Sequence, residues 1–92
     1  MAYRILKYEL SRLHPIQMPA NAILLSVGFQ GLVPFVWAIV NEDAPLVLRD
    51  FKLLMTGAET TVALRVAGRF VGTIQREGPF VYHIFDMGET QP

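Results

Sequence analysis

The side chains that could carry out nucleophilic chemistry are few and lie far apart in the sequence. The only serines are Ser11 and Ser26, and there is no cysteine. A catalytic serine needs a base beside it, and in many hydrolases it stands in a Gly-x-Ser-x-Gly turn, which this sequence lacks. The adjacent acids Glu42 and Asp43 suit a hydrated turn better than a paired acid and base. We therefore expect a protein that is not an enzyme.

The two histidines, His14 and His83, are separated by most of the chain, and neither has a partner at a spacing typical of metal ligands. His83 alternates with Val81 and Phe85, so on a strand it points to the same side as they do. We interpret it as a half-buried histidine that makes one hydrogen bond, and keep it as a candidate for contact with a ligand or partner. No metal and no cofactor is predicted.

Three arginines, Arg65, Arg69 and Arg76, lie close together in the sequence. Arg69 and Arg76 are seven positions apart, which on a strand places them on opposite faces. Arg65 and Arg69 are the pair that could hold one anion bidentately; the alternative is that they are ordinary solvated side chains. Eight basic and eight acidic residues give a net charge of zero, so we expect no nucleic-acid partner.

Apolar residues make up 52% of the 92-residue chain, and charged residues make up 17%. A folded protein of this size exposes about 5,400 Å² of surface, and its core is too small to hide so many apolar side chains. Some of them must gather on the surface, which is typical of an interface. We therefore expect a homo-oligomer or another protein partner, with Trp37 and Tyr82 as candidate anchors. Tyr82 shares a strand face with Phe80 and Ile84, which is typical of a core stripe first and of a stacking platform second.

Apolar and polar residues alternate with a period of two through most of the chain, which predicts strands. Turns are expected at 31–32, 41–45 and 77–79, where residues that favour turns gather. Two prolines predict that 14–19 is an edge strand or an extended connection. The segment 87–92 is expected to be a frayed tail. The expected strands are 3–10, 23–30, 33–40, 46–55, 69–76 and 80–86.

Three segments allow finer predictions. In 23–30 the odd-numbered residues are all apolar, which predicts that they share one buried face, and in 33–40 both faces are apolar, which predicts a central strand. Gly72 predicts a bulge or a close backbone approach. The segment 62–66 fits either a short strand or a helical turn. The whole pattern predicts a single all-β domain over 1–92, either an antiparallel sandwich or a partly open barrel of about five to seven short strands.

The residues between 13 and 41 include no charged side chain, a run long enough to span a bilayer. Prolines, glycines and amides interrupt it, and broken backbone is not tolerated against lipid. The first nine residues mix charges with apolar side chains, unlike the apolar core of a signal peptide. We therefore expect no membrane association and a cytoplasmic location.

Motifs spread along the chain resemble a family of small phage and prophage proteins of unknown biochemical role. The most specific are WAIV at 37–40, FVGTIQ at 70–75 and FVYHIF at 80–85, together with ILKYEL at 5–10. The sequence departs from the family pattern in the middle loop, where TGAE at 56–59 replaces Gly-Thr-Gly-His. The resemblance implies a small accessory gene of a virus, expressed in the cytoplasm of a bacterial host.

Such genes often encode stoichiometric inhibitors of host proteins, including proteins of antiviral defence. The resemblance therefore implies a non-catalytic binder of a host protein. Two alternatives stay open. An oligomer could sequester an anionic nucleotide signal in a pocket lined by aromatic residues and closed by Arg65 or Arg69. The protein could also be a small structural or assembly component of a virion.

Overall fold

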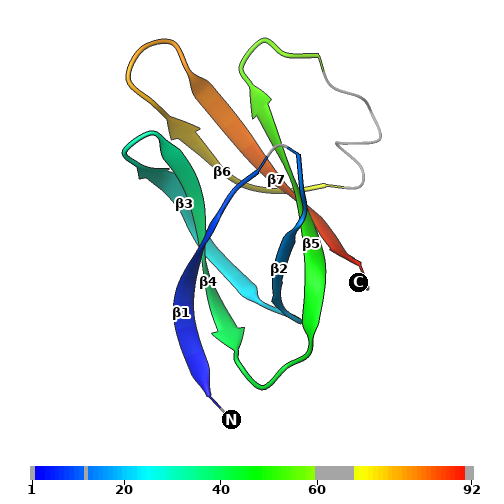
Figure 1. Ribbon diagram of the computed structural model, residues 1–92. Coiled ribbons are helices and arrows are strands. Elements are labelled where there is room, and N and C mark those ends of the chain that lie inside the picture. The colour runs from blue at the N-terminus through cyan, green and yellow to red at the C-terminus, as the bar shows by residue number, and fades with distance from the viewer. Residues whose placement is uncertain (1, 12, 60–67, 91–92) are drawn as a thin grey trace.

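The computed structural model describes residues 2–11, 13–59 and 68–90 of the chain (Figure 1). These residues form seven strands and no helix, and the strands lie in two antiparallel sheets. The predicted all-β sandwich is confirmed, and the described strands do not close into a barrel. The strands are β1 (Tyr3–Glu9), β2 (Ile16–Pro19), β3 (Ile23–Gln30), β4 (Val33–Asn41), β5 (Leu46–Met55), β6 (Arg69–Gln75) and β7 (Val81–Thr90).

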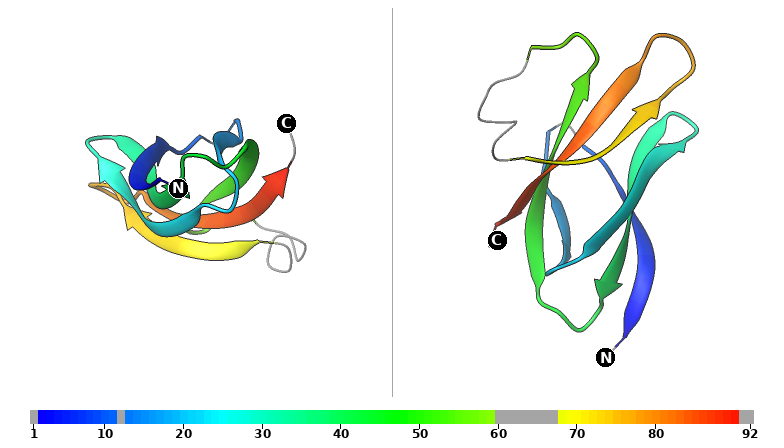
Figure 2. Two further views of the ribbon diagram at one scale, coloured as in Figure 1. Left: turned by 90° about the horizontal axis from the view of Figure 1, so that it is seen from below. Right: turned by 180° about the vertical axis from the view of Figure 1, so that it is seen from behind.

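Among the described residues, sheet A has the strand order β1-β4-β3 and sheet B has the order β2-β5-β7-β6. The two sheets stack as the layers of a sandwich (Figure 2), and β3 packs along β6 where an edge of each sheet meets the other. β4 is central in sheet A, as its two apolar faces predict. Its Val36, Ala38 and Val40 side chains are fully buried between the sheets, whereas Trp37 and Ile39 point to the opposite side.

The core between the sheets is thin. Met18 and Ile84 from sheet B meet Val36 and Val40 from sheet A, and all of them are fully buried. The molecule measures 42 × 31 × 19 Å and exposes 6055 Å² of surface. That area exceeds the ~5,400 Å² typical of this mass, so the flat shape leaves many apolar side chains in contact with water.

β2 confirms the predicted edge strand. It pairs with β5 on one side, with Met18 opposite Val47, and no described strand lies on its other side. It ends at Pro19, whose missing N–H group is tolerated at a sheet edge. The next residue, Ala20, donates its N–H to the Pro45 carbonyl at 2.8 Å, which ties the end of β2 to the turn before β5.

The prediction that all odd-numbered residues of β3 share a buried face is wrong. The pairing of β3 with β4 shifts by one residue at Leu25, which is a β-bulge. Leu24 and Val27 both pack against the core, although a regular strand would direct them to opposite sides. Ile23 and Leu25 are exposed instead. The bulge therefore turns Ile23 to the outside of sheet A.

Gly72 marks both a bulge and a close approach, as predicted. The pairing of β6 with β7 shifts by one residue at Val71. A Cβ atom on Gly72 would stand 2.8 Å from Cγ2 of Val27 on β3, which is closer than ordinary packing allows. The lack of a side chain at Gly72 therefore lets the two sheets meet at this edge.

The predicted frayed tail is wrong for residues 87–90, which continue β7 beside β5 as far as Thr90. A bulge at Met87 and a positive φ of 99° at Gly88 bend the strand and keep it paired. The segment 62–66 lies outside the described residues. The described part of the chain has no helix long and apolar enough to cross a membrane.

Candidate functional site

The outer face of sheet A, which points away from the core, carries a group of apolar side chains. The register of the sheet places Ile5 opposite Ile39 and Ile39 opposite Ile23, so three isoleucines form a row across β1, β4 and β3. Trp37 lies in the next row on β4, opposite Lys7. We call this surface the apolar face, and it consists of Tyr3, Ile5, Ile23, Phe35, Trp37 and Ile39.

Trp37 lies at the centre of the apolar face and is half-buried. Its ring centroid is 6.1 Å from that of Phe35, and the two rings are tilted by 50°. A Cβ atom on Gly28 would be 3.5 Å from the Trp37 ring, so the ring rests on the bare backbone of β3. The Lys7 ammonium lies 4.7 Å from the Phe35 ring centroid and donates a hydrogen bond to Oε1 of Gln30. These contacts restrict the orientation of both rings, and a preorganised ring loses less entropy when a surface is buried.

The rest of the apolar face is open to solvent. Tyr3, Ile5 and Ile23 are 61%, 62% and 60% exposed. Single exposed apolar residues are ordinary, but these adjoin the half-buried Phe35 and Trp37 on one sheet surface. Aromatic side chains are enriched at protein interfaces and act as anchors near their centres. The apolar face is therefore suited to contact with another protein and offers no group for bond-making chemistry.

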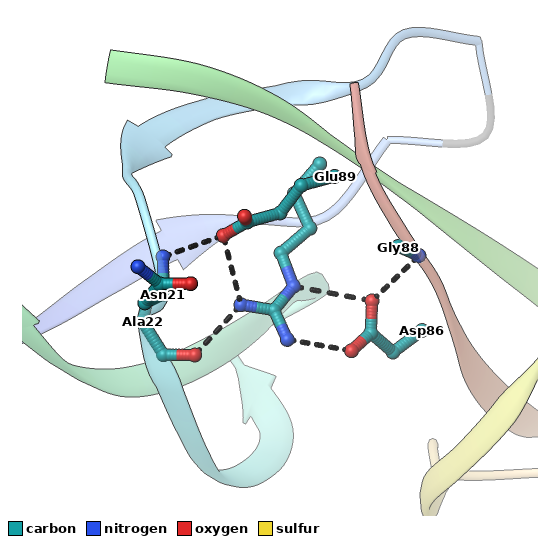
Figure 3. A network of polar contacts seen from close by, with 6 residues as sticks. Asn21, Ala22, Asp86, Gly88 and Glu89 are labelled. Atoms are coloured by element: carbon teal, nitrogen blue, oxygen red, sulfur yellow. Dashed lines mark hydrogen bonds and ion pairs between the residues drawn. The ribbon is translucent and has the colours of Figure 1, made fainter. Parts of the chain in front are cut away.

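A charged network lies at one end of the inner face of sheet B (Figure 3). Arg49 on β5 donates from Nε and Nη2 to the two carboxylate oxygens of Asp86 on β7, at 3.1 and 2.6 Å. Its Nη1 donates to the carbonyl oxygen of Ala22 at 2.7 Å and lies 3.8 Å from Oε2 of Glu89. Glu89 also accepts a hydrogen bond from the backbone N–H of Asn21 at 2.6 Å. The network thereby joins β5, β7 and the segment that enters β3.

The Arg49–Asp86 pair is buried, with side chains 13% and 8% exposed. Burial by itself would raise the pKa of Asp86. The hydrogen bonds from Arg49 and from the Gly88 N–H at 3.0 Å, together with the positive charges of Arg49 and Arg69, outweigh burial and hold the pKa of Asp86 below its usual range. Asp86 is therefore an ionised structural partner of Arg49 at neutral pH, and both of its carboxylate oxygens accept hydrogen bonds within the chain.

Arg69 lies beside this network and lines a cavity of about 320 Å³, whose other lining residues are 22–25, Arg49, Phe70, Val71 and Asp86. Arg49 directs its donors to two carboxylates and a carbonyl, so it adds little net positive charge to the cavity. Arg65, the other half of the predicted anion clasp, lies outside the described residues. Of the two arginines predicted to hold an anion, the structure therefore describes only Arg69, which lies next to the ion pair of Arg49 and Asp86.

His83 makes two hydrogen bonds, one more than predicted. Its Nε2 is 2.8 Å from Oγ1 of Thr56, and its Nδ1 is 3.0 Å from Oγ1 of Thr73. The side chain lines a shallow cavity of about 240 Å³ together with Phe85, so the predicted direction is confirmed. A neutral imidazole donates from one nitrogen and accepts at the other, and a hydroxyl serves either role. With both nitrogens engaged, His83 links β7 to β6 and to the end of β5.

Tyr82 belongs to the core stripe, in agreement with its first interpretation. Its ring meets that of Phe29 edge to face, with centroids 6.3 Å apart and planes at 67°, and it packs against the buried cluster. The structure therefore separates the candidate residues. Trp37 is on the outer face of sheet A, His83 on the outer face of sheet B, and Tyr82 on the side of β7 that faces the core. Of the predicted anchors, Trp37 alone belongs to the apolar face.

A family model described as "Domain of unknown function (DUF7352)" matches the chain over residues 1–92. The chain belongs to this family. The family carries no assigned activity, and the phage origin implied by the sequence motifs stays a prediction. No curated protein and no solved structure matches the chain.

For this member of the family, sequence reasoning misses the charged network. Arg49 and Asp86 are 37 positions apart, on strands whose adjacency the sequence does not reveal. A signal was available, because Arg49 interrupts a strand face that is otherwise apolar, and a buried arginine needs a carboxylate. Ile5 and Ile23 are missed as neighbours of Trp37 because their proximity depends on strand register. Within the described ranges, no three histidines or acids lie close enough together to hold a metal ion.

Proposed function

We propose that this protein is a non-catalytic binder that inhibits a host protein by forming a stoichiometric complex through the apolar face. The observation that carries the proposal is the row of Ile5, Ile39 and Ile23 beside Trp37, on a sheet surface that no described residue covers. Removing apolar surface from water contributes about 25 cal/mol per Å². A partner that covers this surface therefore gains most of its affinity from it.

The margin of the apolar face supports recognition of a specific partner. At one end of this face, the Lys7 ammonium extends from β1 over the Phe35 ring and donates a hydrogen bond to Gln30 on β3. A polar rim around an apolar centre is the usual anatomy of a protein interface. Charges at the rim contribute to orientation and association rate more than to affinity.

The finer identity of the complex rests on the sequence motifs. Their resemblance to phage and prophage proteins supports an accessory protein that acts in the bacterial cytoplasm on a protein of host defence. Sequestration of an anionic nucleotide has weaker support, because the cavity beside Arg69 contains an arginine that Asp86 already neutralises. A role in virion assembly would use the same apolar face with a structural partner.

The proposal is tested by affinity capture from a lysate of the bacterial host, followed by reconstitution with the purified partner. We expect a complex of fixed stoichiometry in light scattering. Trp37→Ala is expected to weaken binding by about 30-fold or more, because it removes a central aromatic anchor. Leu13→Ser is the matched control, since Leu13 is 83% exposed and lies outside the apolar face. Equal affinity for Trp37→Ala and wild type, with both folded by circular dichroism, would contradict the proposal.

A further inference from the structure

Among the described strands, three of the four sheet edges are protected against further pairing. β2 is a four-residue strand that ends in Pro19. β3 and β6 are interrupted by bulges at Leu25 and Val71, and they pack along each other near Gly72. Short length, proline and bulges are the features that stop a sheet from recruiting another strand. β1 has none of them, since it pairs regularly with β4 along all seven of its residues.

The backbone groups on the free side of β1 belong to its odd-numbered residues. At one end the Glu42 N–H donates to the Ala2 carbonyl, and at the other the Leu10 N–H donates to the Pro34 carbonyl, both at 2.9 Å. The N–H and C=O groups of even-numbered residues therefore point to β4. Because these groups alternate in direction along a strand, those of the odd-numbered residues point to the free edge. The residues whose N–H and C=O groups point to the free edge are Tyr3, Ile5, Lys7 and Glu9, and no described strand lies on that side to bind these groups.

The two basic side chains of β1 are held on their own chain. The Lys7 ammonium lies over the Phe35 ring and binds Gln30, and the Arg4 guanidinium binds Glu42 at 2.7 Å. Basic side chains that project from an edge strand normally repel a second strand. Here both positive charges have partners within sheet A or next to it, so neither is left unpaired along this regular edge, where Glu9 is an exposed acid.

We propose that β1 pairs with β1 of a second copy of this chain, antiparallel, about a two-fold axis beside Leu6. In this register Leu6 faces Leu6, Ile5 faces Lys7 and Tyr3 faces Glu9, so every outward-facing residue of β1 has a partner and no like charges are opposed. A shift of two residues in one direction would place Lys7 opposite Lys7. A shift of two in the other direction would leave Glu9 beyond the end of the partner strand.

The dimer would extend sheet A into one continuous sheet of three strands from each copy. A two-fold axis perpendicular to the sheet keeps the sides of the sheet equivalent, so both apolar faces would lie on the same side. The dimer would present two copies of Trp37 on one surface and could engage a symmetric partner with two sites. This inference goes beyond the proposed function and does not depend on it, because self-association is measured with the purified chain alone.

The first test compares two substitutions at Ile5 by size-exclusion chromatography with light scattering. Wild type is expected at twice the 10.3 kDa mass of one chain. Ile5→Pro removes an N–H that points away from β4, so it is expected to leave a folded monomer. Ile5→Thr keeps the backbone group and the β-branched shape, and is expected to remain dimeric. A monomeric wild type at the highest soluble concentration, or a dimer that persists in Ile5→Pro, overturns the proposal.

The second test uses the absence of cysteine from the sequence. Directly opposed residues that are not hydrogen-bonded have Cα atoms about 4.5 Å apart, within the range of a disulfide. Leu6→Cys is therefore expected to form a covalent dimer under mild oxidation, at least ten times faster than the exposed control Leu13→Cys. Equal rates for the two variants overturn the proposed register even if Ile5→Pro does not fold. Capture of a host partner through Trp37 would be unaffected by that result.

Discussion

Two regions of the molecule reverse the usual placement of charged and apolar side chains. The charged network is buried on the inner face of sheet B, and the apolar face is exposed on the outside of sheet A. On the inside, Arg49 and Asp86 form a bidentate ion pair with side chains 13% and 8% exposed. On the outside, isoleucines 60% or more exposed lie beside the half-buried Trp37. Charged residues are almost never fully buried unless they are paired, and contiguous apolar surface is rare on a protein without a partner.

The two regions differ in whether their interactions are complete within one chain. In the charged network, Asp86 accepts from Arg49 and from Gly88, and no buried side-chain polar atom of the described residues lacks a hydrogen-bond partner. On the apolar face, by contrast, Tyr3, Ile5 and Ile23 stay largely exposed to water. The comparison indicates that the charged residues hold strands together, and it leaves the apolar residues as the surface on which our proposed recognition of another protein rests.

The largest expected effect comes from breaking the charged network. Asp86→Ala leaves the guanidinium of Arg49 buried without its bidentate partner, so we expect the free energy of unfolding to fall by about 3–5 kcal/mol. The measurement is urea denaturation followed by circular dichroism. Glu42→Ala is the matched control, because it removes an ion pair of similar length whose side chains are exposed, and it is expected to cost under about 1 kcal/mol.

A similar loss for Asp86→Ala and Glu42→Ala would remove the distinction between a buried structural network and a surface pair. If the Asp86 variant is still folded, its affinity for a partner is expected to stay close to that of wild type, because Arg49 and Asp86 lie on sheet B and the apolar face lies on sheet A. Lost affinity in a folded Asp86→Ala variant would place the network in the binding surface.

A smaller effect on stability is expected for Trp37→Ala. The ring is half-buried on the outside of sheet A and gives up about 2 kcal/mol of burial, which is less than the 3–5 kcal/mol typical of a fully buried aromatic residue. Urea denaturation followed by circular dichroism measures it, since the variant lacks the sole tryptophan. A loss as large as that of Asp86→Ala would mean that Trp37 is a core residue and that the apolar face is structural.

The positions of the strands could be predicted because most of them alternate in polarity and end at a turn. The two apolar faces of β4 predict its central place in a sheet, and Gly72 predicts a bulge because glycine in a strand has few other uses. The prediction for the buried face of β3 is wrong because one extra residue at Leu25 reverses the side of the sheet to which each following side chain points. Because most residues of β3 are apolar, the alternation of apolar and polar residues does not reveal where the extra residue stands.

The candidate site could be predicted only in part, because its composition depends on contacts between strands distant in sequence. The residue type of Trp37 marks it as a candidate anchor, but its neighbours Ile5 and Ile23 come from two other strands. The segment 87–92 is predicted to be a frayed tail because the last residues of a domain are often poorly ordered. Residues 87–90 continue β7 because Glu89 and Asp86 both meet Arg49 on β5.

The smallest expected effect is the pH dependence of the charged network. The pKa of Asp86 is lowered in the folded protein, so its ionised form contributes stability above the unfolded value of about 3.9, and that contribution is lost as pH falls through the lower folded value. Asp86→Asn lacks this titration. We therefore expect the difference in unfolding free energy between wild type and Asp86→Asn to be constant above about pH 5 and to shrink below about pH 4.

Urea midpoints measured from pH 7 down to the acid limit of folding test this expectation, and Trp37→Ala provides the contrasting variant. Because its substitution lies on the other sheet, Trp37→Ala retains the Asp86 titration, and its difference from wild type should stay the same across the whole range. A gap between wild type and Asp86→Asn that persists in acid would mean that the carboxylate gains nothing from Arg49. The buried pair of Arg49 and Asp86 would then contribute no more to the free energy of unfolding than the exposed pair of Arg4 and Glu42.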